Sequence, residues 1–338
     1  MQFSGFKAPL GVLYDADFGA RIGPALGLCL LYGLDGKNEC RVTSISVTKP
    51  SLRAAAFAEV IGRFYAGAVS GAFAAAGRNL PTGLAEGDGD PADTAMMRAV
   101  LDKKTPEGKP AYDHGLHSLN DTAEPAPMLR NALTAQADQN CVVVLNGPAT
   151  NLAKLLDLNG AQGWIERKAR LLVMVDGVCS TPLHRAAARK VLAEWPAPVV
   201  FVPAAVGAAA PYPAASIDTD FAWSPAHPLV DAYRAAGTMP YDAAAPELAA
   251  VLHAVREKDK PFGLSDAGTV TIADDGTARF AAGAGKHRQL VLDPAQREKI
   301  LKTYIELVTA KPVPRVPRFR SQQVQPPKPD AAKPAEKK

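Results

Sequence analysis

Short apolar runs recur along the chain, and segments whose apolar residues have helical spacing lie between them. Near-continuous apolar runs are typical of strands that are covered on both faces of a sheet. We predict strands at residues 11–15, 42–47, 141–145, 171–175 and 199–202, and helices at residues 25–32, 52–65, 151–156, 185–194 and 247–256. This alternation predicts an α/β fold with a mostly parallel central sheet flanked by helices.

The pattern changes towards the end of the apolar part of the chain. Residues 269–272 and 278–280 flank the turn-forming sequence ADDGT, which predicts a small β-hairpin. Asp293 followed by Pro294 is typical of a helix start, so we expect a final helix that extends to about Ala310. The segment 78–121 is rich in Gly, Pro and Asp, and we predict that it forms a loop inserted over the rim of the site.

Charge divides the chain into two parts. The net charge is +4, but residues 311–338 carry eight Lys or Arg and two Asp or Glu, so the remainder has a net charge of −2. We therefore expect one domain at 1–310 and a disordered, Pro- and Lys-rich basic tail at 311–338. The tail either solubilises the protein or contacts an acidic polymer or lipid surface. Because no DNA- or RNA-binding motif accompanies it, we expect no specific nucleic-acid partner.

Composition excludes two other classes of protein. Apolar residues make up 47% and charged residues 21% of the chain, which is not typical of a mainly disordered protein. No run of 18 uncharged apolar residues occurs, so we predict no membrane span. Residues 1–10 lack the apolar core of a signal peptide, so we expect a cytoplasmic location, or an exported one if a signal was removed.

The four cysteines do not indicate a metal site. They are Cys29, Cys40, Cys141 and Cys179, and none forms a CxxC pair. We therefore predict buried free thiols.

Polar residues follow several predicted strands at the point where each strand ends. Asp15 and Asp17 follow the first strand, Thr48 the second, the segment 146–151 the central one and Asp176 the next. Ligands of an open parallel sheet bind beyond the carboxyl ends of its strands, so we expect these residues to surround the functional site. From the residues alone, the two aspartates could bind a hard cation, activate water or cap the following helix.

Two motifs at these strand ends resemble one known family. The first strand is followed by D-x-D-x-G at residues 15–19, and the central strand is followed by G-P-x-T-N-L-A at residues 147–153. Both motifs are similar to those of the inosine/uridine-preferring nucleoside hydrolases. Segments 187–201, 211–217 and 239–242 also resemble a bacterial branch of that family, and the resemblance covers about residues 9–310.

The resemblance implies hydrolysis of the N-glycosidic bond of a ribonucleoside, with Ca²⁺ positioning the attacking water. It implies that Asp17 is a calcium ligand and the general base. Asp15, Thr150 (through its backbone carbonyl) and Glu247 are implied as further calcium ligands. It also implies that Asn151 and Asp176 bind the substrate, which is a nucleoside or a related ribosyl compound. The resemblance further allows the chain to form a homo-oligomer.

This chain departs from the family pattern at the expected metal site. An Asp-Asp pair of the family falls on Gly23-Pro24, which carry no carboxylate but suit a turn and the first turn of a helix. Arg21 adds a positive charge nearby. The segment 178–184, where the family places a ribose-binding Glu or Asn, contains neither. At an effective dielectric constant of about 20, a unit charge about 6 Å away changes a cation's energy by ~3 kcal/mol. We therefore expect Ca²⁺ binding to be weak or absent.

Three interpretations of the function remain open at this stage. The favoured one is a nucleoside-hydrolase-like protein that keeps its ligand pocket while calcium-dependent catalysis is impaired or lost. The second is an active nucleoside N-ribohydrolase in which Asp17 is the base. The third is an anion- or nucleotide-binding module that uses Arg21 and the helix N-terminus near Pro24.

Overall fold

The computed structural model describes residues 8–66, 80–85, 91–177 and 179–313. Most of the basic tail predicted at 311–338 lies outside the described residues, as does Val178 in the short segment after Asp176. The predicted boundary between a domain at 1–310 and a separate tail therefore stays a prediction.

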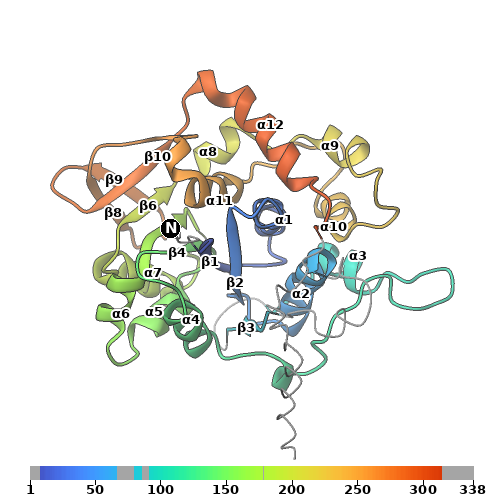
Figure 1. The fold of residues 1–338 in the computed structure, drawn as a ribbon, viewed down its shortest axis with the longest axis horizontal. Coiled ribbons are helices and arrows are strands. Elements are labelled where there is room, and N and C mark those ends of the chain that lie inside the picture. The colour runs from blue at the N-terminus through green and yellow to red at the C-terminus, as the bar shows by residue number, and fades with distance from the viewer. Residues whose placement is uncertain (1–7, 67–79, 86–90, 178, 314–338) are drawn as a thin grey trace, which may run out of the picture.

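A single sheet runs through the centre of the described part of the chain (Figure 1). Its order is β3-β2-β1-β4-β5-β6-β10-β8-β9, and β7 pairs with β10. All pairings from β3 to β10 along this order are parallel, and those of β8 with β10 and β9 are antiparallel. The strands are β1 (Leu10–Ala16), β2 (Cys40–Val47), β3 (Thr82–Leu84), β4 (Cys141–Asn146), β5 (Ala169–Val175), β6 (Val199–Val202), β7 (Gly263–Leu264), β8 (Gly268–Ile272), β9 (Ala278–Ala282) and β10 (His287–Val291).

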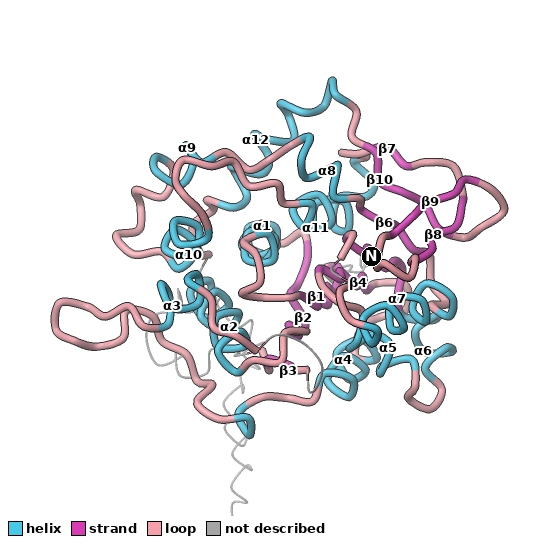
Figure 2. Tube along the Cα trace, turned by 180° about the vertical axis from the view of Figure 1, so that it is seen from behind, coloured by secondary structure: helices cyan, strands magenta, loops and turns pink. Residues whose placement is uncertain are grey.

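Helices cover both faces of the sheet (Figures 1 and 2). They are α1 (Gly23–Gly36), α2 (Leu52–Ala66), α3 (Ala95–Leu101), α4 (Pro125–Thr134), α5 (Thr150–Leu156), α6 (Ala161–Lys168), α7 (Pro182–Glu194), α8 (Ala204–Ala209), α9 (Ala214–Thr219), α10 (Pro228–Ala236), α11 (Pro246–Arg256) and α12 (Arg297–Val308). Within the described ranges, none of these helices is long and apolar enough to cross a membrane. The α/β fold with a mostly parallel sheet is therefore confirmed.

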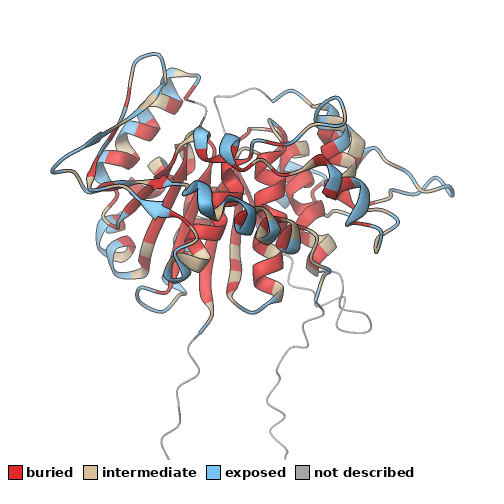
Figure 3. Cartoon of the chain, turned by 90° about the horizontal axis from the view of Figure 1, so that it is seen from above, coloured by how far each residue is buried: buried red, intermediate tan, exposed pale blue. Residues whose placement is uncertain are grey.

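Two apolar cores lie on the two faces of this sheet. Val12 and Tyr14 of β1 belong to the core that includes α1 and α11, whereas Leu13 belongs to the core that includes α5 and α7. Adjacent residues of one strand point to opposite faces, which explains this division. Figure 3 shows the buried strands at the centre and the exposed residues at the periphery. All four cysteines are buried and unpaired, as predicted.

The five predicted strands and the five predicted helices all occur, with small shifts at their ends. The hairpin of β8 and β9 is also present. The final helix begins differently, because Pro294–Gln296 forms a 3₁₀ turn before α12 and the Asp293 side chain accepts the Ala295 N–H at 3.0 Å. The prediction of a loop throughout 78–121 is wrong. This segment contains β3, which pairs with β2 at the sheet edge, and also α3.

The connection order creates a switch point beside β1. The chain passes from β1 to β2 and β3 on one side, and then returns to β4 on the other side of β1. The connections after β1 and β4 therefore diverge at the carboxyl ends of these two strands, which is where ligands of such sheets bind.

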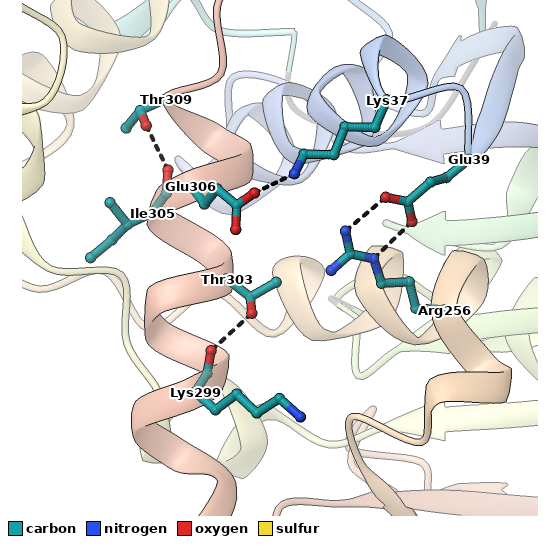
Figure 4. Close-up of polar contacts among 8 residues, drawn as sticks. All are labelled: Lys37, Glu39, Arg256, Lys299, Thr303, Ile305, Glu306 and Thr309. Carbon is teal, nitrogen blue, oxygen red and sulfur yellow. Dashed lines mark hydrogen bonds and ion pairs between the residues drawn. The ribbon is translucent and has the colours of Figure 1, made fainter.

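The last helix closes the structure over α1. Ion pairs Lys37–Glu306 and Arg256–Glu39 tie the neighbouring segments together (Figure 4), and both Arg256–Glu39 hydrogen bonds measure 2.8 Å. A Cβ added at Gly33 of α1 would lie 2.2 Å from the backbone oxygen of Leu307 in α12. Only glycine permits this approach of the two helices.

We predict that Gly33→Ala destabilises the protein by about 1–3 kcal/mol, because the new methyl group would push against a backbone carbonyl. Gly163→Ala, at an exposed position of α6, is the matched control, since its Cβ would meet nothing within 4 Å. The control is expected to be neutral or stabilising by up to about 1 kcal/mol. Urea unfolding of both variants measures the difference, and equal free energies of unfolding would contradict the close-packing explanation.

We also predict an acid-sensitive contribution from His253 in α11. Burial lowers the pKa of His253 to about 4, and neither ring nitrogen has a hydrogen-bond partner in the described part of the chain. The folded pKa lies below the unfolded value of 6.5, so this stability is complete above pH 6.5 and is lost as the pH falls towards 4.

His253→Leu removes this titration. Between pH 6.5 and 4, the wild type should lose up to about 1.4 kcal/mol per pH unit relative to the variant. Denaturant unfolding at several pH values in this range measures the gap. If the two proteins gave parallel pH profiles, His253 would not be titrating as described.

Candidate functional site

Asp15 and Asn151 meet at the carboxyl ends of β1 and β4. Asp15 is fully buried in β1, and its Oδ1 accepts hydrogen bonds from Ser46 Oγ at 2.6 Å and Asn151 Nδ2 at 2.8 Å. Ser46 comes from the neighbouring strand β2, and Asn151 from the first turn of α5. The second oxygen of Asp15 has no partner among the described residues. The structure thus brings together two residues that the sequence analysis assigned to the site.

The environment of Asp15 favours its neutral form. Burial raises the pKa of Asp15 to about 7, and the hydrogen bonds from Ser46 and Asn151 oppose this effect only in part.

Asp17 lies where three strand ends converge. Its backbone N–H donates to Asn146 O at 3.3 Å, and its side chain is half-buried. A Cβ at Gly147 would lie 2.8 Å from Asp17 N and 2.7 Å from Thr48 Oγ1, so glycine is needed here for close approach. Thr150 is half-buried as the first residue of α5.

Glu247 is paired with Arg21. Glu247 is fully buried in the first turn of α11, and its Oε1 accepts a 2.7 Å hydrogen bond from Arg21 Nε. Burial raises the pKa of Glu247, whereas the charge of Arg21 lowers it. A Cβ at Gly23 would lie 2.2 Å from Glu247 Oε2. Gly23 is the first residue of α1 rather than part of a preceding turn, and it provides the space for this carboxylate.

Asp176 lies at the end of β5, near the start of α8. Its carboxylate accepts a hydrogen bond from the backbone N–H of Ala204, and burial raises its pKa while Arg21 lowers it. Arg21 is therefore within electrostatic reach of both Asp176 and Glu247.

Sequence reasoning missed a hydrogen-bonded pair beside these residues. Tyr14 OH donates to Pro24 O at 2.8 Å and accepts a 2.7 Å hydrogen bond from Asn146 Nδ2. Asn146 Oδ1 is buried and has no partner in the part of the chain that the structure describes. Tyr14 sits in an apolar strand, so its sequence context does not distinguish it from an ordinary core aromatic. Asn146 stands out in the sequence only because it lies at the end of the predicted central strand.

The oxygens that a calcium ion could use at this site are partly engaged by other residues. Within the described ranges, no group of three or more His, Cys, Asp and Glu side chains could hold a metal. Calcium usually takes six to eight oxygen ligands, with several carboxylates among them. Here one Glu247 oxygen is bound to Arg21, and one Asp15 oxygen accepts two hydrogen bonds, whereas Glu247 Oε2 and Asp15 Oδ2 have no partner among the described residues.

No family model and no curated protein sequence matches this chain. Its fold, however, matches solved structures over nearly their whole length. The inosine-uridine preferring nucleoside hydrolase from Bacillus anthracis is 14% identical, with a TM-score of 0.62 over 89% of this chain and 99% of that one. An inosine-guanosine nucleoside hydrolase is 16% identical, with a TM-score of 0.62 over 88% and 98% of the two chains.

A third structure extends the comparison beyond proteins described as hydrolases. The type III effector protein XopQ, solved in complex with adenosine diphosphate ribose, is 13% identical, with a TM-score of 0.58 over 90% of this chain and 95% of that one. At such low identities the likeness concerns the fold. The chain therefore has the fold of the nucleoside hydrolases.

Proposed function

We propose that this chain is a nucleoside-hydrolase-like protein that binds a nucleoside or related ribosyl ligand, and that its calcium-dependent catalysis is impaired or lost. The ligand site lies at the carboxyl ends of β1 and β4. The functional domain corresponds to residues 1–310, and residues 311–338 form a separate basic segment.

One observation carries the ligand-binding proposal. Several buried polar atoms at these strand ends have no partner within the described residues, namely Asp15 Oδ2, Thr48 Oγ1, Asn146 Oδ1 and Asn151 Oδ1. A buried polar group without a hydrogen bond costs about 1–3 kcal/mol. Three of these atoms are carboxyl or amide oxygens that need a donor, and sugar hydroxyl groups supply donors.

The solved structures support the ribosyl class of ligand. Two are described as nucleoside hydrolases, and a third contains adenosine diphosphate ribose. In this proposal Asp15 and Asn151 accept hydrogen bonds from sugar hydroxyl groups, and Asp176 contacts the ligand from the end of β5. Asp17 is the residue that would accept a proton from an attacking water.

Impaired catalysis follows from the donor set of the site. N-glycosidic cleavage develops positive charge on the sugar and needs a water molecule held on one face of the ring. In this proposal the residues that the resemblance implies as calcium ligands hold the ion poorly, because Arg21 binds one oxygen of Glu247 and brings a positive charge to the site. Asp17 alone provides a base but no means of fixing the water, so binding is retained while turnover is lost.

We predict that inosine raises the melting temperature of the protein. A ligand present at 100 times its Kd stabilises the folded state by about 2.7 kcal/mol. Asn151→Ala should abolish this gain, because it removes both the free amide oxygen and the hydrogen bond to Asp15. Asn131→Ala, on the exposed side of α4, is the control that should keep it. A shift that survives Asn151→Ala would place the ligand elsewhere.

We further predict that calcium produces no saturable heat in calorimetric titration and that inosine and uridine are not hydrolysed in the same buffer. If the wild type released the nucleobase measurably and Asp17→Asn did not, the protein would instead be an active N-ribohydrolase. Wild type and Asp17→Asn are compared at equal concentration with and without calcium. A contaminating hydrolase would give the same rate in both preparations.

A further inference from the structure

Arg21 is a cation held at the site by a buried carboxylate. Its Nε donates to Glu247 Oε1 at 2.7 Å, while its Nη2 is buried and has no partner among the described residues. The Arg21 side chain is 34% exposed and that of Glu247 is 0% exposed. One edge of the guanidinium is therefore fixed, while the buried Nη2 still lacks an acceptor.

The position of Glu247 is fixed by packing against α1. Its carboxylate lies against Gly23, and a Cβ at Gly27 would be 3.2 Å from the Glu247 Cβ. A guanidinium loses little further entropy when such an anchor already orients its planar fork. Arg21 is thus more restricted than an ordinary surface arginine.

The surrounding charges favour a neutral ligand over an anion. The charge of Arg21 is balanced by Glu247, and Asp176 lies within its electrostatic reach. The unpartnered atoms of Asp15 and Asn151 at the neighbouring strand ends are oxygens, which repel a phosphate but accept hydrogen bonds from hydroxyl groups. A hydroxyl group both donates and accepts, so a sugar satisfies the arginine and these oxygens together.

We propose that Arg21 donates hydrogen bonds to a neutral ribosyl ligand in place of a bound metal ion, with Glu247 as the residue that positions it. Ligand binding is then independent of divalent cations. This inference rests on the proposed function and identifies the residue that gives the same site its specificity.

Calorimetric titration with inosine tests the proposal in EDTA and in calcium. We expect the same Kd for the wild type in both buffers, and a 10- to 100-fold weaker Kd for Arg21→Met, because hydrogen bonds from a charged donor are strong. Arg41→Met is the matched control. Arg41 also pairs with a buried carboxylate, that of Asp35 at 2.9 Å, and its side chain is 38% exposed. It lies at the opposite end of the strands from Arg21. Its inosine Kd should equal that of the wild type.

Two further variants separate binding from folding. Arg21→Lys keeps the charge but loses the planar fork, and it should also weaken inosine binding at least several-fold. Glu247→Gln should weaken binding in the wild type but add nothing in the Arg21→Met background. A role of Glu247 in stability alone would not produce this non-additivity.

The outcomes distinguish this inference from the proposed function. If Arg21→Met binds inosine as Arg41→Met does, or if EDTA abolishes binding by the wild type, the role of Arg21 is overturned while the ligand site stands. Tighter binding of inorganic phosphate than of inosine, lost in Arg21→Met, would overturn the preference for a neutral ligand. No binding of inosine by the wild type would overturn both.

Discussion

The buried carboxylate of Glu247 is the constraint on which this site depends. A buried charge is costly unless it is paired, and Arg21 supplies the partner. The pair requires glycine at position 23, since any side chain there would collide with the carboxylate. It therefore fixes the start of α1 against the start of α11. In the proposed function, the same interaction also sets which charges the strand ends present to the ligand.

Most of the fold could be predicted from local sequence pattern. Strands such as β4 and β6 are short apolar runs, and they are recognisable because both of their faces are buried. β3 has only three residues, and β10 mixes His, Arg and Gln with apolar residues, so neither resembles a buried strand. Both join the sheet through pairing with strands distant in sequence, which a local pattern does not encode.

The site was predictable to the extent that strand ends define it. Asp15 and Asn151 were placed together because parallel strands end at the same edge, and their hydrogen bond agrees with that argument. The pairing of Arg21 with Glu247 was not predictable, since 226 residues separate them. Sequence reasoning treated the first as a repelling charge and the second as a metal ligand. In the structure the two side chains form an ion pair, which depends on how α1 and α11 are placed.

The packing of α1 also bears on how the chain is made. This helix is formed within the first 36 residues, yet its partners α11 and α12 come from the far end of the domain. During synthesis its apolar surface stays without its native cover until the ribosome has released about residue 308. The amino-terminal segments therefore cannot mature as an independent unit, because the native cover of α1 is made last among the described helices.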